Sequence, residues 1–75
     1  MTPDRSIDCV GFFCPMPIIK TKLELDTMKP GELLEVLADD EGFEKDLPAW
    51  CKTSGNIFVE MKYADGVFKG YVRKK

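Results

Sequence analysis

The 75-residue chain contains no histidine. This absence excludes the commonest general base, the Cys–His and Ser–His nucleophile pairs, and the nitrogen ligand most often found at zinc sites. The chain also lacks the phosphate-binding patterns G-x-G-x-x-G and G-x-x-x-x-G-K-[ST]. The usual routes to nucleotide binding and to an activated hydroxyl nucleophile are therefore closed.

Long apolar runs are absent as well. The longest uncharged run, Cys9–Ile19, is shorter than the roughly 18 residues that a membrane-spanning helix needs. Near the start of the chain, Asp4, Arg5 and Asp8 interrupt any stretch that would serve as a secretory signal. We therefore expect no membrane association and a cytoplasmic location.

The chain has no surplus of positive charge. Its 11 basic and 13 acidic residues give a net charge of −2, whereas autonomous DNA-binding modules are strongly basic. With 44% hydrophobic and 32% charged residues, the composition is typical of an ordinary globular chain. The length predicts a single domain, residues 1–75, with a thin core.

The three cysteines do not form a complete set of disulfides. Cys9, Cys14 and Cys51 are odd in number, and none belongs to a C-x₂-C pair of the kind that binds structural zinc. Because an unpaired set is typical of a reducing compartment, we predict free thiols and no metal centre. The cysteine sulfur atoms are then the most obvious reactive groups of the chain.

The spacing of apolar residues predicts the order βαβαββ. Strands are expected where apolar residues alternate or form short runs, helices where they recur at intervals of three and four, and turns at Gly and Pro. The predicted elements are a strand over 5–9, a helix from about Pro15 to Met28, a strand over 33–38, a helix ended by Gly55, and a hairpin of strands over 57–63 and 67–73.

Two helices cannot cover both faces of a four-stranded sheet this small. We therefore predict an α+β two-layer sandwich with a mixed sheet, both helices on one face, and the other face partly solvated. The right-handed crossover rule makes the first two strands parallel.

The two predicted helices are defined by different sequence signals. In the first, Ile19 and Leu23 at i, i+4 and Ile18 and Leu25 at i, i+7 indicate an amphipathic helix. In the second, Pro48 allows two starts. Either the helix begins near residue 44, or residue 46 caps a shorter helix with the proline close to its first positions.

Cys14 falls where a strand gives way to a helix, at or next to the helix N-cap. Unpaired backbone N–H groups and the positive end of the helix dipole favour a thiolate at such a position. Because Pro15 and Pro17 carry no N–H, the donors reduce mainly to Met16 and Ile18, and we expect moderate activation. The alternative is that Cys14 is a small buried hydrophobe and the prolines merely start a helix.

The segment around Cys14 resembles the L-D-x-x-G-L-x-C-P-x-P signature of the TusA/SirA-like sulfur-carrier family. The matching run is Ile7-Asp8-Cys9-Val10-Gly11-Phe12-Phe13-Cys14-Pro15-Met16-Pro17. The resemblance continues through Lys29-Pro30-Gly31-Glu32, Asp39-Asp40, Asp46-Leu47-Pro48-Ala49-Trp50-Cys51 and Val72-Arg73-Lys74.

The resemblance implies a function and a set of partners. Cys14 would accept a sulfane sulfur as a persulfide from a cysteine desulfurase or a rhodanese and pass it to an acceptor protein. Gly11, Pro15 and Pro17 would shape the presentation of the thiol, and no cofactor would be needed. The acceptor pathway stays open among transfer RNA thiolation, molybdenum cofactor assembly, sulfur oxidation and selenium metabolism.

Residues flanking Cys14 are candidates for partner binding. Phe13 and Met16 are apolar, and such residues are enriched at interface cores. The acidic loop Asp39–Glu41 follows a strand parallel to the first one, so Asp40 is expected near Cys14 as a partner contact. A metal site at this loop is the less favoured reading, since acidic loops are usually solvated.

Two other functions compete with the sulfur carrier. Cys9 is expected in the core, but as a resolving thiol it would make a thiol–disulfide switch with Cys14. Cys51 shares a helix face with Leu47 and is expected to be buried. A non-catalytic protein- or RNA-binding regulatory module would tolerate replacement of Cys14 by serine.

Overall fold

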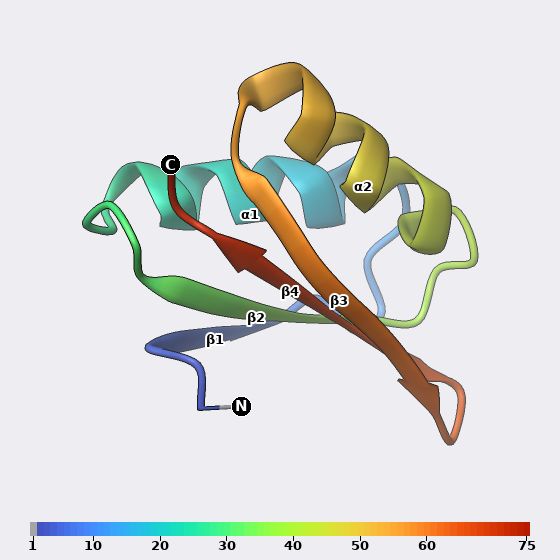
Figure 1. Cartoon of the computed structure of the whole chain (residues 1–75). Helices are drawn as coiled ribbons and strands as arrows, with labels where there is room; N and C mark the ends of the chain where they lie inside the picture. The colour runs from blue at the N-terminus through green and yellow to red at the C-terminus, as the bar shows by residue number, and fades with distance from the viewer. Residues whose placement is uncertain (1) are drawn as a thin grey trace.

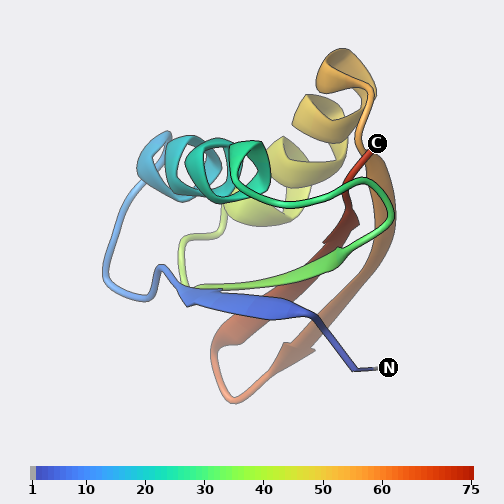
Figure 2. The ribbon, with the colours of Figure 1, turned by 90° about the vertical axis from the view of Figure 1, so that its left-hand side faces the viewer.

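The computed structural model describes residues 2–75 and confirms the order βαβαββ. Its elements are β1 (Arg5–Asp8), α1 (Met16–Asp26), β2 (Leu33–Ala38), α2 (Phe43–Ser54), β3 (Ile57–Ala64) and β4 (Val67–Arg73). Both helices cover the same face of the sheet, so the two-layer α+β sandwich is confirmed (Figures 1 and 2). Within residues 2–75, no helix combines the length and apolarity that spanning a membrane requires.

The sheet is mixed, with the strand order β1-β2-β4-β3. Strands β1 and β2 are adjacent and parallel, and Ile7 lies opposite Val36. Strand β4 pairs antiparallel with both β2 and β3, and a β-bulge interrupts the β3–β4 register between Phe58 and Glu60. The parallel first pair and the closing hairpin are both as predicted.

The core lies between the helices and the sheet. Strand β2 alternates, so that Leu34, Val36 and Ala38 are buried within this layer. Helix α2 contributes Phe43, Leu47 and Cys51, which share one face at spacings of four. The remaining buried members of the core are Cys9, Leu25, Met28, Phe68 and Val72.

Helix α2 lies very close to strand β4 at Gly70. A Cβ atom at this position would overlap the side chain of Leu47 and would lie 3.2 Å from the Phe43 ring. The missing side chain therefore lets α2 settle onto the sheet. This close approach sets the distance between the sheet and the start of α2. The first turn of α2 borders the functional site.

The face of α1 that packs on the sheet differs from the predicted one. Pro17, Thr21 and Leu25 are buried, whereas Ile19 and Leu23 are 43% and 60% exposed. Thr21 is tolerated in the core because its hydroxyl donates to the carbonyl of Pro17 at 2.7 Å. The prediction was correct for Leu25 and wrong for Ile19 and Leu23, because a buried threonine is invisible to an apolar pattern.

Helix α2 begins at Phe43, with Gly42 at its N-cap and Pro48 inside the helix. Of the two predicted starts, the one near residue 44 is therefore correct. The helix ends at Gly55, whose φ of 86° is a left-handed conformation that glycine adopts without steric cost.

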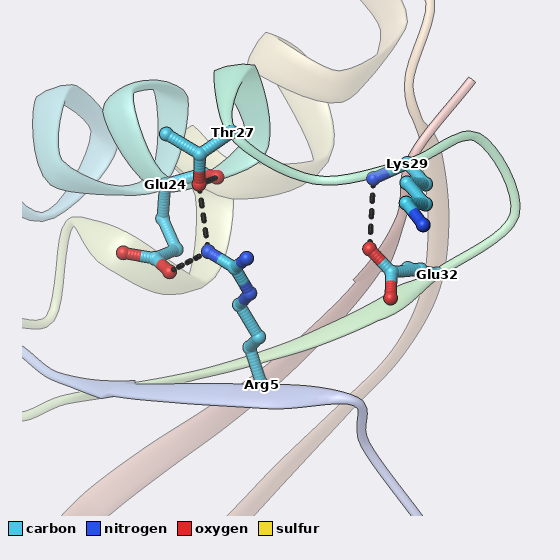
Figure 3. A network of polar contacts seen from close by, with 5 residues as sticks. All are labelled: Arg5, Glu24, Thr27, Lys29 and Glu32. Carbon is cyan, nitrogen blue, oxygen red and sulfur yellow. Dashed lines mark hydrogen bonds and ion pairs between the residues drawn. The ribbon is translucent and has the colours of Figure 1, made fainter.

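A polar cluster joins the edge strand β1 to the end of α1. The guanidinium of Arg5 donates to Glu24 at 2.8 Å and to the Thr27 hydroxyl at 2.7 Å (Figure 3). In the following turn, the Lys29 backbone N–H donates to the Glu32 carboxylate at 2.7 Å. The two Arg5 contacts tie β1 to the C-terminal end of α1.

The open face of the sheet is partly solvated, as predicted. There Glu35 accepts hydrogen bonds from Ser6 at 2.8 Å and from the Tyr71 hydroxyl at 2.7 Å. The Tyr71 hydrogen bond is the main cause that lowers the pKa of Glu35, and the same contact raises the pKa of Tyr71 to about 12. The network links β1, β2 and β4 across the face that no helix covers.

Candidate functional site

Cys14 lies on the loop between β1 and α1, at the edge where the two parallel strands end. It immediately precedes Pro15, the N-cap residue of α1, so the predicted position next to the helix start is confirmed. Its side chain is exposed, whereas Cys9 and Cys51 are buried, and all three thiols are free. Cys14 is therefore the one accessible thiol within residues 2–75, and it is not the small buried hydrophobe of the alternative interpretation.

Carboxylates hold the Cys14 loop in place. The backbone N–H of Gly11 donates to Asp39 at 2.9 Å, and that of Cys14 donates to Asp40 at 3.0 Å. Both acids belong to the loop after β2, which lies at the same end of the sheet as the segment preceding α1 (Figure 1). The predicted proximity of Asp40 and Cys14 is thus confirmed, and the contact runs through the backbone of the cysteine.

Gly11 has a backbone conformation in the loop that other residues rarely adopt. Its φ of 91° lies in the left-handed region, where residues with a Cβ atom are strained. Pro17 is buried in the first turn of α1, and the peptide bond between Cys14 and Pro15 is cis.

The thiol of Cys14 donates a hydrogen bond to the Asp46 carboxylate, with 2.8 Å between Sγ and Oδ2. Asp46 lies in the first turn of α2, 32 residues further along the chain. Sequence reasoning missed this contact because it treated Asp46 only as a possible helix cap. The available signal was position, since the start of α2 follows β2 at the edge where the Cys14 loop follows β1.

The electrostatics of Cys14 differ from the expected thiolate. The N–H groups of Met16 and Ile18 already donate to the carbonyls of Phe13 at 2.8 Å and Pro15 at 3.1 Å. The pKa of Cys14 is raised, chiefly because the thiol donates to Asp46, with smaller effects from desolvation and from the nearby negative charges. This direction is opposite to the expected moderate activation, and its main cause is the Asp46 carboxylate, which is far away in the sequence and 2.8 Å from Sγ in the structure.

The other two cysteines are core residues, as predicted. The backbone N–H of Cys9 donates to the carbonyl of Leu37 at 2.7 Å and extends the β1–β2 pairing by one residue. Burial raises the pKa of Cys9, and it raises the pKa of Cys51 to about 11. Cys9 is thus buried whereas Cys14 is exposed, and the two thiols are not joined.

Beside the thiol, apolar side chains face solvent. Phe13 is 78% exposed, and Met16, Ile19 and Leu23 continue the exposed surface along α1 at spacings of three and four. We call these four residues the apolar stripe. It begins at Phe13, directly beside Cys14, and both Phe13 and Met16 are exposed there.

The residues present do not assemble a metal centre. Within the described residues 2–75, no group of three or more Cys, Asp or Glu side chains is arranged to hold a metal ion. Asp39 and Asp40 instead accept backbone hydrogen bonds from the Cys14 loop. The acidic loop thus has a structural role at the site.

Comparison with known proteins agrees with this geometry. The family described as sulfurtransferase TusA matches residues 5–74. The sulfur carrier protein TusA of Allochromatium vinosum is 38% identical over 95% of this chain and 93% of its own length. A relative from Aquifex aeolicus, whose name also designates a sulfur carrier, is 38% identical over 95% of this chain. That protein is longer, and this chain spans only 36% of its length.

A solved structure gives the same result for the fold. The SirA-like protein from Desulfitobacterium hafniense superposes with a TM-score of 0.81 at 27% identity, over 92% of this chain and 95% of the other. Together with the family match across residues 5–74, this similarity shows that the chain belongs to the TusA family.

Proposed function

We propose that the chain is a sulfur carrier that accepts a sulfane sulfur as a persulfide on Cys14 and relays it to an acceptor protein. The observation that carries the proposal is the single exposed thiol at the edge of the sheet, with both other thiols buried. The names of relatives such as the Allochromatium vinosum protein support it.

The proposed reaction is an exchange between a thiol and a persulfide, with no net oxidation or reduction. The Cys14 thiolate attacks the outer sulfur of a donor persulfide, the donor S–S bond breaks, and the donor cysteine leaves as a thiolate. A cysteine desulfurase or a rhodanese would provide the donor persulfide. We assign removal of the Cys14 proton to a base of the partner, because this chain has no histidine and its Asp46 carboxylate, which accepts the thiol hydrogen bond, raises the pKa of Cys14.

The shape of the site supports transfer between proteins. Gly11, Pro15 and Pro17 shape the segment, and Asp40 holds the Cys14 backbone at 3.0 Å. We assign Phe13 and Met16 to contact with the partner, and Asp40 to the border of that contact. Three unpaired cysteines fit a reducing compartment, so we place the relay in the cytoplasm.

Intact-protein mass spectrometry tests this proposal. The protein is incubated with a cysteine desulfurase and cysteine, and separately with a rhodanese and thiosulfate. We expect a reducible gain of one sulfur atom in the wild type and in Cys51→Ser, and none in Cys14→Ser. Absence of the gain with both donors, together with a reversible Cys9–Cys14 disulfide, would instead indicate the thiol–disulfide switch.

A further inference from the structure

The contact between Cys14 and Asp46 exists in only one of the two states that a carrier must visit. In the unloaded protein, Sγ bears a hydrogen and donates it to Asp46 Oδ2 at 2.8 Å. In a persulfide, Sγ is bonded to the outer sulfur and has no hydrogen to donate. Loading therefore takes the donated hydrogen off Sγ, and the S–H of a protonated persulfide lies one bond further out, so the present charge-assisted contact with Asp46 is lost.

We propose that Asp46 is a positioning residue that favours the unloaded, protonated form of Cys14 and thereby biases the carrier toward sulfur release. The part of this inference that concerns release rests on the proposed function. The effect of Asp46 on the Cys14 thiol rests on the hydrogen bond between these two residues alone.

The surroundings of the thiol reinforce the effect of Asp46. A Cβ atom added to Gly42 would lie 3.3 Å from Asp40 Oδ2, 3.5 Å from Asp46 Oδ2 and 3.9 Å from the Cβ of Cys14. Both carboxylates therefore converge beside the cysteine. Asp46 of α2 and Asp40 of the preceding loop are the charged groups that act on the thiol, and both raise its pKa.

The release step can be written with atoms and electrons balanced. An acceptor thiolate attacks the outer sulfur of the protonated Cys14 persulfide, the S–Sγ bond breaks, and its electron pair stays on Sγ. The acceptor now holds the persulfide. Its proton passes through water to Sγ, and the new thiol donates again to Asp46. Re-formation of this hydrogen bond stabilises the products of release.

The thiol itself is tested by its rate of alkylation with iodoacetamide as a function of pH, followed on the Cys14 peptide. Asp46→Asn is compared with the wild type, with Asp46→Glu, and with Glu44→Gln. The last variant removes an exposed acid from the same helical turn without touching Cys14.

We expect Asp46→Asn to react several-fold faster at neutral pH, with the midpoint of its profile moved to lower pH. Glu44→Gln should match the wild type, and Asp46→Glu should return toward it. Identical profiles for Asp46→Asn and the wild type would overturn the inference.

Sulfur release is tested by the persulfide occupancy of Cys14 at a fixed ratio of glutathione persulfide to glutathione. Asp46→Asn should hold several-fold more persulfide than the wild type, and equal occupancy would overturn the proposed bias. If no variant took up sulfur, the carrier role and the bias would both fail, while the alkylation result would still decide the effect on the thiol.

A measurement on the wild-type chain covers the case in which Asp46→Asn does not fold. The ¹³Cγ signal of Asp46 and the ¹³Cβ signal of Cys14 are followed through an alkaline titration. We expect both signals to change with one common midpoint. An Asp46 signal that stays constant while Cys14 titrates would overturn the inference.

Discussion

The thiol of Cys14 and the carboxylate of Asp46 are joined by a 2.8 Å hydrogen bond, although 32 residues separate them along the chain. The two meet because the Cys14 loop and the start of α2 follow the carboxyl ends of neighbouring parallel strands, where sites in α/β folds collect. The hydrogen bond of the Cys14 thiol is therefore made to a residue of α2, and not to the start of α1. Variation in the first turn of α2 offers a way to tune a carrier without altering its cysteine motif.

The two aspartates of the β2–α2 loop should protect different amides. Asp40→Asn weakens the acceptor of the Cys14 N–H, and Asp39→Asn weakens the acceptor of the Gly11 N–H. We expect a loss of about 1 kcal/mol in the free energy of unfolding for each variant. Hydrogen exchange measured residue by residue should show faster exchange at Cys14 in the first variant and at Gly11 in the second. Equal exchange at both amides in both variants would contradict this assignment.

Gly70→Ala should destabilise the fold, because the new Cβ atom would overlap Leu47 and lie 3.2 Å from the Phe43 ring. Overpacking of this kind costs about 1 to 3 kcal/mol. Denaturant unfolding measures the loss, with Lys69→Ala, an exposed neighbour on β4, as the control that should change little. A Gly70→Ala variant as stable as the control would show that α2 is free to move away from the sheet.

Stability should fall at alkaline pH because of Tyr71. The folded protein keeps its hydroxyl protonated up to a pKa of about 12, whereas an unperturbed tyrosine ionises near 10. The folded state thus binds the proton more tightly, and its advantage is complete below pH 10 and lost as pH rises to about 12. Tyr71→Phe should remove this part of the pH dependence of the unfolding free energy, whereas Tyr63→Phe should keep it. An unchanged alkaline slope in Tyr71→Phe would contradict the role of the contact with Glu35.

Phe13 should matter for transfer between proteins and not for the chemistry of the thiol. Because its side chain is 78% exposed, Phe13→Ser should change the free energy of unfolding by less than about 0.5 kcal/mol. Loading from a cysteine desulfurase should slow several-fold, while exchange with glutathione persulfide should keep its wild-type rate. Leu23→Ser, at the far end of the apolar stripe, shows how far along α1 the contact extends. Equal slowing with both donors would place the effect of Phe13 on the thiol itself.

Local patterns were sufficient to predict the order of the elements and the two layers, but not the place of β4 between β2 and β3. Alternation in the strand residues, the hairpin of strands over 57–63 and 67–73 and the helix stop at Gly55 each depend on near neighbours in the chain, and the structure has all of them. The buried face of α1 was only partly predictable. Thr21 enters the core because the Pro17 carbonyl satisfies its hydroxyl, and this contact cannot be read from apolar spacing.

The site was predictable in its position and not in its electrostatics. The order of strand, cysteine and proline-rich helix start located Cys14, and the parallel strand pair located Asp40 beside it. The acceptor of the thiol proton was not foreseen, because Asp46 reaches Cys14 only once α2 has packed on the sheet. Long-range side-chain contacts of this kind determine the sign of a pKa shift, and a single sequence does not reveal them.

In the proposed relay, the sulfane sulfur is carried by Cys14. The most direct measurement is peptide-level mass spectrometry of the loaded protein after its persulfides have been trapped by alkylation. We predict that the added sulfur lies on the Cys14 peptide, that dithiothreitol releases it, and that the Cys9 and Cys51 peptides carry none. Added sulfur on Cys9 or Cys51, or equal loading of Cys14→Ser, would contradict the account.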